Sequence, residues 1–335
     1  MALNRRQFLK MTAAGVGTAM CTNASALQRE AKPLSPDAVG MLYDSTLCIG
    51  CKACMSACKE ANGMPPEFFG EQNLWDSPQE TSGDTLNVIK VYKDGTGEQK
   101  DREVDGFAFM KRHCLHCVDP SCVSVCPVSA MTKDPITGIV EHHEDRCIGC
   151  RYCVYSCPFG IPKYEYNDAF GQIQKCEFCV HLQDKGLVPA CCDVCPTGAT
   201  LFGRVDDLKQ EAQRRLEAKA GDTYVFPRGK LGAGRPSHEA TVPEYKQHVY
   251  GLKELGGTQI MYMSAVPLDK LGLPTNVPDF GYPTVSEGIQ HMLYKWMLAP
   301  AILLGGLAYV VRKNTRKDHE DSASTAGKGS DGGES

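Results

Sequence analysis

Short apolar stretches separated by turn residues run through the middle of the chain and predict several strands. Residues 87–92 alternate between apolar and polar side chains, and residues 106–110 can pair with them across a turn-rich connection. Residues 138–140 and 258–266 are also strand-like. Residues 267–283 are rich in proline and predict an extended connection with little regular structure.

One amphipathic helix is predicted over residues 206–219. Leu208, Ala212 and Leu216 recur at four-residue spacing, which places them on one face of a helix, and Gly221 follows as a stop. The other positions are mostly charged, so the opposite face is predicted to be solvated.

The longest apolar stretch lies near the C-terminus. Residues 292–311 contain one charged residue, Lys295, close to one end, and their length matches a bilayer. We therefore predict a transmembrane anchor over residues 289–313. Basic residues at 312–317 place this end in the cytoplasm by the positive-inside rule. Pro300 interrupts the run, which leaves a buried core helix as the alternative.

The N-terminus has the layout of an export signal. Arg5 and Arg6 open a basic segment, a weakly apolar run follows, and the small residues Ala-Ser-Ala occupy 24–26. The paired arginines resemble the twin-arginine class, so residues 1–26 are predicted to be a removable signal of that type. The alternative is a soluble N-terminal helix. Because the twin-arginine route exports folded proteins, often with a cofactor installed, it favours metal sites over disulfides.

Composition narrows the class of protein. Of the 335 residues, 42% are hydrophobic and 23% are charged, which excludes wholesale disorder and a polytopic membrane protein. The formal net charge of -4, with no basic stripe, excludes nucleic acid as a partner. The 18 cysteines indicate either a secreted disulfide framework or metal ligation.

The spacing of the cysteines separates these two explanations. Cys21 lies in the signal, and Cys191 and Cys192 are adjacent; Cys191 keeps a three-residue step to the next cysteine, so Cys192 is the spare. The remaining cysteines form four groups, of which the first and third share the spacing C-x2-C-x2-C-x3-C. The groups are Cys48, Cys51, Cys54 and Cys58; Cys114, Cys117, Cys122 and Cys126; Cys147, Cys150, Cys153 and Cys157; and Cys176, Cys179, Cys191 and Cys195.

Four such groups are a strong signal for 4Fe–4S clusters. A cube needs four thiolates, and in bacterial ferredoxins the last cysteine of the motif ligates the other cluster of a pair. Proline follows the last cysteine of the second, third and fourth groups and turns the chain away. Gly50 and Gly149 lie where the backbone must pass close to a cluster. Zinc and disulfides are the alternatives, but zinc favours paired C-x2-C units.

The other chemistry-bearing residues are assigned no site. His113, His116, His142 and His143 lie near cysteines, but the ligand places are filled, so we interpret them as surface or hydrogen-bonding residues. No nucleotide fingerprint, Ser-His-Asp set or HExxH motif occurs. We therefore expect no catalytic residue, and a chain that is not an enzyme by itself.

An internal repeat predicts how the groups pair. Groups two and three are close in sequence and form a contiguous ferredoxin unit, so groups one and four form a split unit that encloses it. The predicted fold is α+β, with two nested bacterial-type ferredoxin units, insertions and one C-terminal transmembrane helix. The insert is either a docking surface or a cover over the clusters. The predicted segments are residues 1–26 (signal), 40–58 with 170–202 (split unit), 59–113 (insert), 114–169 (contiguous unit), 203–288 (helix, strand and extended region), 289–313 (anchor) and 314–335 (disordered cytoplasmic tail).

Crossing the last cysteines within each unit gives four predicted ligand sets, each for one 4Fe–4S cluster. They are set 1, Cys48, Cys51, Cys54 and Cys195; set 2, Cys114, Cys117, Cys122 and Cys157; set 3, Cys147, Cys150, Cys153 and Cys126; and set 4, Cys176, Cys179, Cys191 and Cys58.

The chain resembles the four-cluster ferredoxin-like subunits of periplasmic respiratory oxidoreductases, most closely those that serve hydrogenases of the hydrogenase-2 type. The resemblance covers essentially the whole chain. It is carried by NRRQFLK (4–10), GMLYDSTLCIGC (40–51), HCVDPSCVSVCPVSA (116–130), KDPITGIV (133–140), GGTQIMYMSAVP (256–267) and IQHMLYK (289–295).

The resemblance implies electron transfer between a periplasmic nickel–iron hydrogenase and an integral, quinone-reactive membrane subunit. The implied partners are the small and large hydrogenase subunits, the membrane subunit and the twin-arginine export machinery. The implied location is the periplasmic face of the inner membrane. The alternatives are the equivalent subunit of a molybdopterin reductase or formate dehydrogenase, and a non-redox protein with zinc or disulfides.

Overall fold

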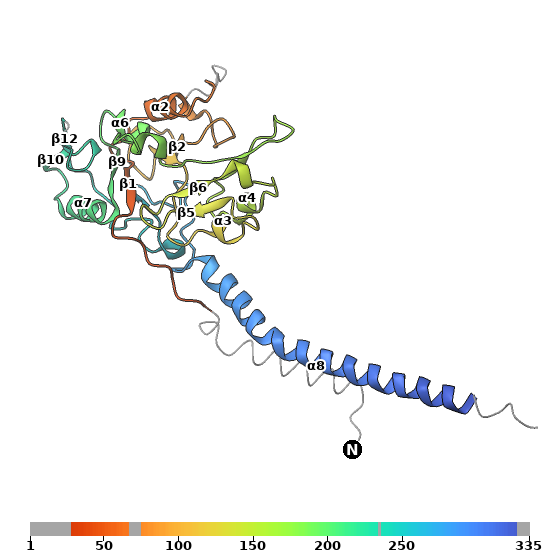
Figure 1. Ribbon diagram of the computed structural model, residues 1–335. Coiled ribbons are helices and arrows are strands. Elements are labelled where there is room, and N and C mark those ends of the chain that lie inside the picture. Colours follow the sequence, from red (N-terminus) through yellow and green to blue (C-terminus); the bar gives the residue numbers. More distant parts are fainter. Residues whose placement is uncertain (1–27, 67–74, 234–235, 327–335) are drawn as a thin grey trace, which may run out of the picture. The chain divides into compact units, whose positions relative to one another are not determined.

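The computed structural model describes residues 28–66, 75–233 and 236–326. The predicted signal, with Cys21, lies outside these residues. The chain divides into two units: Glu30–Thr284 forms one, and Val285 onwards, together with the residues up to Arg29, forms the other. Every cysteine group lies in the first unit, called the body below (Figure 1).

A four-stranded sheet brings distant parts of the body together, in the order β11-β9-β1-β13. Strand β1 (Val39–Asp44) is antiparallel to β9 (Thr200–Arg204) and parallel to β13 (Ile260–Met263). Strand β11 (Gly229–Lys230) extends the sheet beyond β9. Strand β13 lies within the segment 258–266, so that predicted strand is confirmed.

Helix α7 (Val205–Glu217) packs against this sheet and confirms the predicted amphipathic helix. Leu208 and Ala212 are buried in one cluster with residues of β1, β9 and β13, because their spacing places them on the same helix face. Arg215 is also fully buried, although the pattern predicted solvated charges there.

The insert forms a three-stranded sheet of β2 (Val88–Lys93), β4 (Gly106–Arg112) and β3 (Gln99–Lys100). Strands β2 and β4 are antiparallel, which confirms the predicted pairing. Phe109 of β4 lies directly over the Gly50 backbone, and its carbonyl accepts a hydrogen bond of 3.0 Å from the hydroxyl of Tyr43. This packing supports the interpretation of the insert as a cover over group one.

The remaining short elements repeat one arrangement twice. In the first case, β1 precedes group one and pairs with β9, which follows group four. In the second case, β6 (Val140–His142) precedes group three and pairs with β5 (Met131–Lys133), which follows group two. Helix α4 (Tyr152–Ser156) contacts α3 (Ser121–Ser124), and α2 (Ala53–Ala61) contacts α6 (Ala190–Asp193) (Figure 1). The other elements are η3 (Glu144–Arg146), β7 (Lys163–Tyr164), β8 (Ile173–Gln174), α5 (Val180–Gln183), β10 (Thr223–Phe226), β12 (His238–Thr241) and η4 (Glu254–Gly256).

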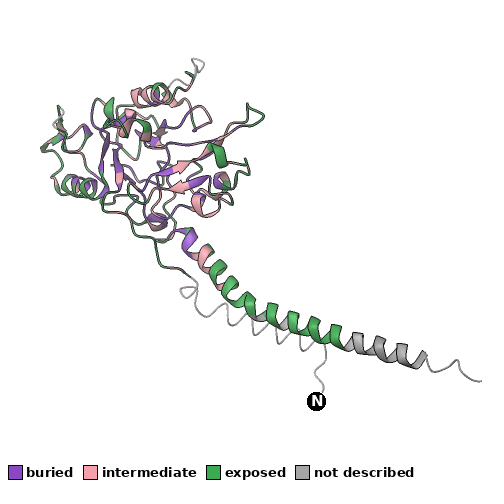
Figure 2. Ribbon diagram, viewed as in Figure 1, coloured by how far each residue is buried: buried purple, intermediate pink, exposed green. Residues whose placement is uncertain are grey.

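Helix α8 (Tyr282–Ala326) contains the predicted anchor. Its stretch Tyr282–Lys313 is the one helical segment in the described residues that is long and apolar enough to cross a membrane. No part of its most apolar window is buried, which counts against a core helix (Figure 2). The helix continues through the first part of the tail predicted to be disordered. The residues there include good helix formers, and propagation adds one hydrogen bond for each residue.

Candidate metal centres

The loops of groups one and three have the same backbone shape. Gly50 and Gly149 have φ of 68° and 67°, and Lys52 and Arg151 have φ of 58° and 61°. Lys52 and Arg151, both with a left-handed backbone conformation, are the N-caps of α2 and α4. Each helix therefore begins at the same point of its motif. Identical spacing therefore folds into identical loops, each carrying its first three cysteines at matching positions.

Two cavities are each lined by cysteines from two groups. The first is lined by Cys195 together with cysteines of the group-one loop, and the second by Cys126 together with cysteines of the group-three loop. The first cavity holds Cys48, Cys51, Cys54 and Cys195, and the second holds Cys147, Cys150, Cys153 and Cys126. These are the members of sets 1 and 3.

Mutual electrostatic effects show the same arrangement for set 2. Burial raises the pKa of Cys117 well above its ordinary value, and the neighbouring sulfurs of Cys157, Cys122 and Cys114 raise it further. Because the interaction between charges falls with distance, the sulfurs that act on one another lie close together.

Set 4 behaves in the same way. Burial raises the pKa of Cys176 well above its ordinary value, and Cys58, Cys191 and Cys179 add to the increase. In both sets, three cysteines from one group meet the last cysteine of another. The structure thus brings together the members of all four predicted sets.

The chemistry of these donors fits a cofactor that binds thiolates. Burial raises the pKa of Cys58 to about 12 and that of Cys153 to about 11, so without metal these groups are neutral thiols. The positive charge of a bound metal would lower the pKa of these thiols, and they would bind it as thiolates. Backbone N–H groups already point at sulfur: Ala130 donates to Cys126 Sγ over 3.2 Å and Met131 over 3.4 Å. Hydrogen bonds of this kind stabilise thiolate ligands.

No disulfide joins any of the cysteines in the described residues, so the disulfide alternative finds no support there. The same residues contain no group of three His, Cys, Asp or Glu side chains arranged for a single metal ion.

The surroundings of the adjacent Cys191 and Cys192 indicate which of the two belongs with set 4. Cys191 lies with Cys58, Cys176 and Cys179, as described above. Cys192 is fully buried beside it, and a hydrogen bond from the Cys192 thiol lowers the pKa of Cys191. The pair therefore favours a thiolate at Cys191 and a thiol at Cys192, which supports the choice of Cys192 as the spare.

The interpretation of the histidines as surface or hydrogen-bonding residues is wrong for His113, which is buried and whose ring nitrogens have no hydrogen-bond partner in the described residues. His116 is also buried but is hydrogen-bonded. Burial lowers the pKa of each, so both rings are neutral. Nδ1 of His116 accepts a hydrogen bond of 2.9 Å from the N–H of Val140, and its ring packs against Phe178. His143 is hydrogen-bonded to Thr132 over 2.8 Å. The hydrogen-bonding interpretation is confirmed for His116 and His143.

Sequence reasoning missed three lysines beside the sulfurs, of which Lys111 and Lys175 are buried and Lys133 is partly buried. Lys133 lies near Cys117 and Lys175 near Cys114, whereas Lys111 lies near Cys191. The available signal was a lysine placed in or next to an apolar strand close to a cysteine group, as in the sequence of β4.

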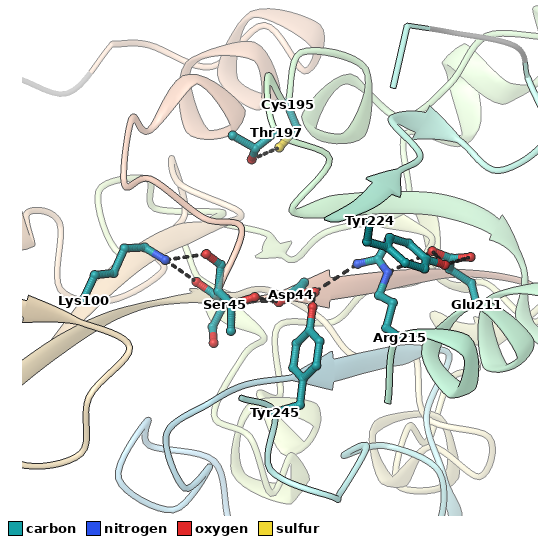
Figure 3. A network of polar contacts seen from close by, with 10 residues as sticks. Asp44, Ser45, Lys100, Cys195, Thr197, Glu211, Arg215, Tyr224 and Tyr245 are labelled. Atoms are coloured by element: carbon teal, nitrogen blue, oxygen red, sulfur yellow. Dashed lines mark hydrogen bonds and ion pairs between the residues drawn. The ribbon is translucent and has the colours of Figure 1, made fainter. Parts of the chain in front are cut away.

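A buried ionic network fixes the strand that leads into group one (Figure 3). Asp44, at the end of β1, accepts hydrogen bonds from Arg215 over 3.0 Å and from Tyr245 over 2.6 Å. Arg215 also donates to Glu211 over 2.9 Å. Asp44 and Arg215 have no exposed side-chain surface, so each charge depends on its partners.

The four sets form a series through the body. Cys54 of set 1 interacts with Cys191 of set 4. The fully buried Tyr262 interacts with both Cys176 of set 4 and Cys114 of set 2. Cys122 of set 2 in turn interacts with a cysteine of set 3, Cys153. The order along the series is therefore 1, 4, 2, 3.

The ends of this series reach the surface. Cys51 of set 1 and Cys150 of set 3 are exposed, whereas sets 2 and 4 contain no exposed cysteine. An arrangement with two accessible ends and two protected centres suits electron transfer between partners at opposite ends of the series.

Two family models described as a 4Fe–4S dicluster domain match the chain, one at residues 40–127 and the other at residues 106–205. Over 324 residues the chain is 46% identical to the hydrogenase-2 operon protein HybA of Escherichia coli O157:H7, covering 95% of this chain and 98% of the relative.

Two relatives with lower identity are not hydrogenase-operon proteins by name. The formate dehydrogenase-O iron–sulfur subunit of Escherichia coli (strain K12) is 32% identical over 267 residues, covering 79% of this chain and 78% of the relative. The protein NrfC of the same organism is 34% identical over 233 residues, covering 68% of this chain and 92% of the relative.

Proposed function

This chain belongs to the 4Fe–4S dicluster protein family that includes the hydrogenase-2 operon protein HybA, and from that premise we propose that it serves a hydrogenase. It is an iron–sulfur electron-transfer protein with four 4Fe–4S clusters. The proposed route runs between a periplasmic nickel–iron hydrogenase and a quinone-reactive subunit in the membrane. The observation that carries this assignment is the 46% identity to HybA over nearly the whole chain.

We propose that sets 1 to 4 are the ligands of the four clusters. The cavities lined by sets 1 and 3 and the mutual interactions within sets 2 and 4 support this assignment. Each bound cluster would accept and release one electron. The chain's own contribution is to hold the sulfurs, donate N–H groups to them and exclude water from the two central sets.

The two ferredoxin units are proposed to be nested, with the contiguous unit inside the split one. Support comes from the repeated pairing of a strand before one group with a strand after another, β1 with β9 and β6 with β5. The contacts of α2 with α6 and of α3 with α4 follow the same rule.

The proposed location is the periplasmic face of the inner membrane, with α8 as the anchor and residues 1–26 as the twin-arginine signal. The apolar stretch Tyr282–Lys313, whose most apolar window has no buried residue, supports the anchor. Replacing Arg5 and Arg6 by lysines should leave the protein in the cytoplasm. Normal delivery of that variant to the periplasm would contradict the export assignment.

Purification of the native complex in detergent tests the partner. We expect a nickel-containing hydrogenase to co-purify, with about 16 iron atoms per copy of this chain, since each cube holds four. A molybdopterin subunit in place of the nickel enzyme would overturn the hydrogenase assignment in favour of the formate dehydrogenase type. Bound zinc with little iron would overturn the electron-transfer function itself.

A further inference from the structure

Lys111 is a buried cation without an ordinary partner. It lies on β4 and its side chain has no exposed surface. Its Nζ has no oxygen or nitrogen hydrogen-bond partner in the described part of the chain. Because a buried ammonium is tolerated only with compensating negative charge, some other group must balance it.

The groups that act on the charge of Lys111 are sulfur atoms. They are those of Cys191, Cys54 and Cys192, of which Cys54 belongs to set 1 and Cys191 to set 4. Lys111 therefore lies close to sulfurs of both centres of the split unit. Four thiolates make a cluster anionic, so the two clusters would supply the charge that Lys111 lacks.

The buried lysine beside set 2, Lys175, has a different environment. Nζ of Lys175 donates to Glu177 Oε1 over 3.1 Å and to the carbonyl of Val140. Glu177 compensates its charge, so less of the field of Lys175 reaches the sulfurs of set 2. Lys111, which has no carboxylate partner, differs from it in this respect.

We propose that Lys111 raises the reduction potentials of the two clusters in the split unit above the values they would have without it. The proposal rests on the ligand sets of the proposed function. Reduction adds one negative charge to a cluster, and a nearby cation in a low-dielectric interior stabilises the reduced form. Lys111 would not ligate a cluster; its charge would act on the reduction potentials of the two clusters through the nearby sulfurs.

The test measures reduction potentials in the fully loaded full-length protein by redox titration followed by electron paramagnetic resonance. Lys111→Met should lower the reduction equilibrium constant of two of the four clusters by about tenfold, which is 59 mV for one electron. The other two clusters should keep their potentials. Lys111→Arg, which keeps the charge, should recover most of the change.

The matched control is Lys93→Met, because Lys93 is an exposed lysine on β2, in the same small sheet. Water and salt screen its charge, so no potential should change. Four unchanged potentials in Lys111→Met with about 16 iron atoms bound would overturn the proposal while leaving the electron-transfer function intact. A wild-type protein lacking four clusters would instead overturn the proposed function.

Lys111→Gln provides a second neutral variant if Lys111→Met binds less iron. The same two potentials should fall in it. If neither neutral variant binds the split-unit clusters, Lys111 is needed for assembly and not for the potential, and the proposal is wrong.

Discussion

The loops of groups one and three are the same motif in two different surroundings. Both have the C-x2-C-x2-C-x3-C spacing, and their glycines have φ of 68° and 67°. In the first loop, Phe109 of the insert presses on Gly50, whereas the nearest atoms to a side chain at Gly149 would be those of Tyr164, at 3.6 Å. Four residues before its first cysteine, the first loop has the fully buried Asp44, and the second loop has the partly exposed His143.

The difference shows which features the motif fixes. Ligand spacing and backbone shape are local, so they are preserved in both loops. The covering residues are contributed by distant segments and differ between the loops. Each outer cluster site can therefore present its own surface to a partner while the same loop geometry holds the cluster.

The largest expected effect tests whether the loops exchange their last ligands. Cys157→Ala should remove the set 2 cluster and leave the set 3 cluster, because Cys157 lies with the sulfurs of set 2. Iron content should fall from about 16 to about 12 atoms per chain, and paramagnetic resonance should identify the lost centre. Cys192→Ala, at the spare cysteine, is the control and should lose no iron. Loss of the set 3 cluster alone would contradict the crossed assignment.

The next effect concerns the strands that lead into the loops. Arg215→Met should lower the free energy of unfolding by about 3–5 kcal/mol, because it leaves the buried carboxylate of Asp44 without its cation. His143→Ala, at the position that corresponds to Asp44 in the other unit, should cost about 1 kcal/mol, since one partly exposed hydrogen bond is lost. Denaturant unfolding of the loaded protein measures both. Equal losses would mean that the two strands are anchored alike.

The smallest effect compares the two glycines directly. Alanine at either position adopts a left-handed backbone, which costs about 1–3 kcal/mol. At Gly50 the new Cβ would lie 2.3 Å from Phe109, so Gly50→Ala should cost about 1–3 kcal/mol more than Gly149→Ala. Thermal unfolding of the pair checks this difference. Equal stabilities would show that the insert yields easily and does not constrain the group-one loop.

Much of the site could be predicted because it depends on local spacing. The cysteine groups, the loops and the β2–β4 pairing all come from residues near one another in sequence, where covalent geometry limits the choices. The burial of His113 and His116 could not be predicted, because it arises from packing between distant segments. The helical course of α8 beyond the predicted anchor was also missed, since the composition there suggested a tail and not a continuing helix.

The sequence by itself determined that this protein binds four clusters, and the spacing of sixteen cysteines predicts their ligands, because that spacing is written in the order of the residues. Only the tertiary structure decided what surrounds the sulfurs. The pairing of β1 with β9, and the burial of Lys111 beside Cys54 and Cys191, join segments far apart in the chain. Charge and burial depend on such contacts, since the field at a sulfur is set by whatever lies near it in space.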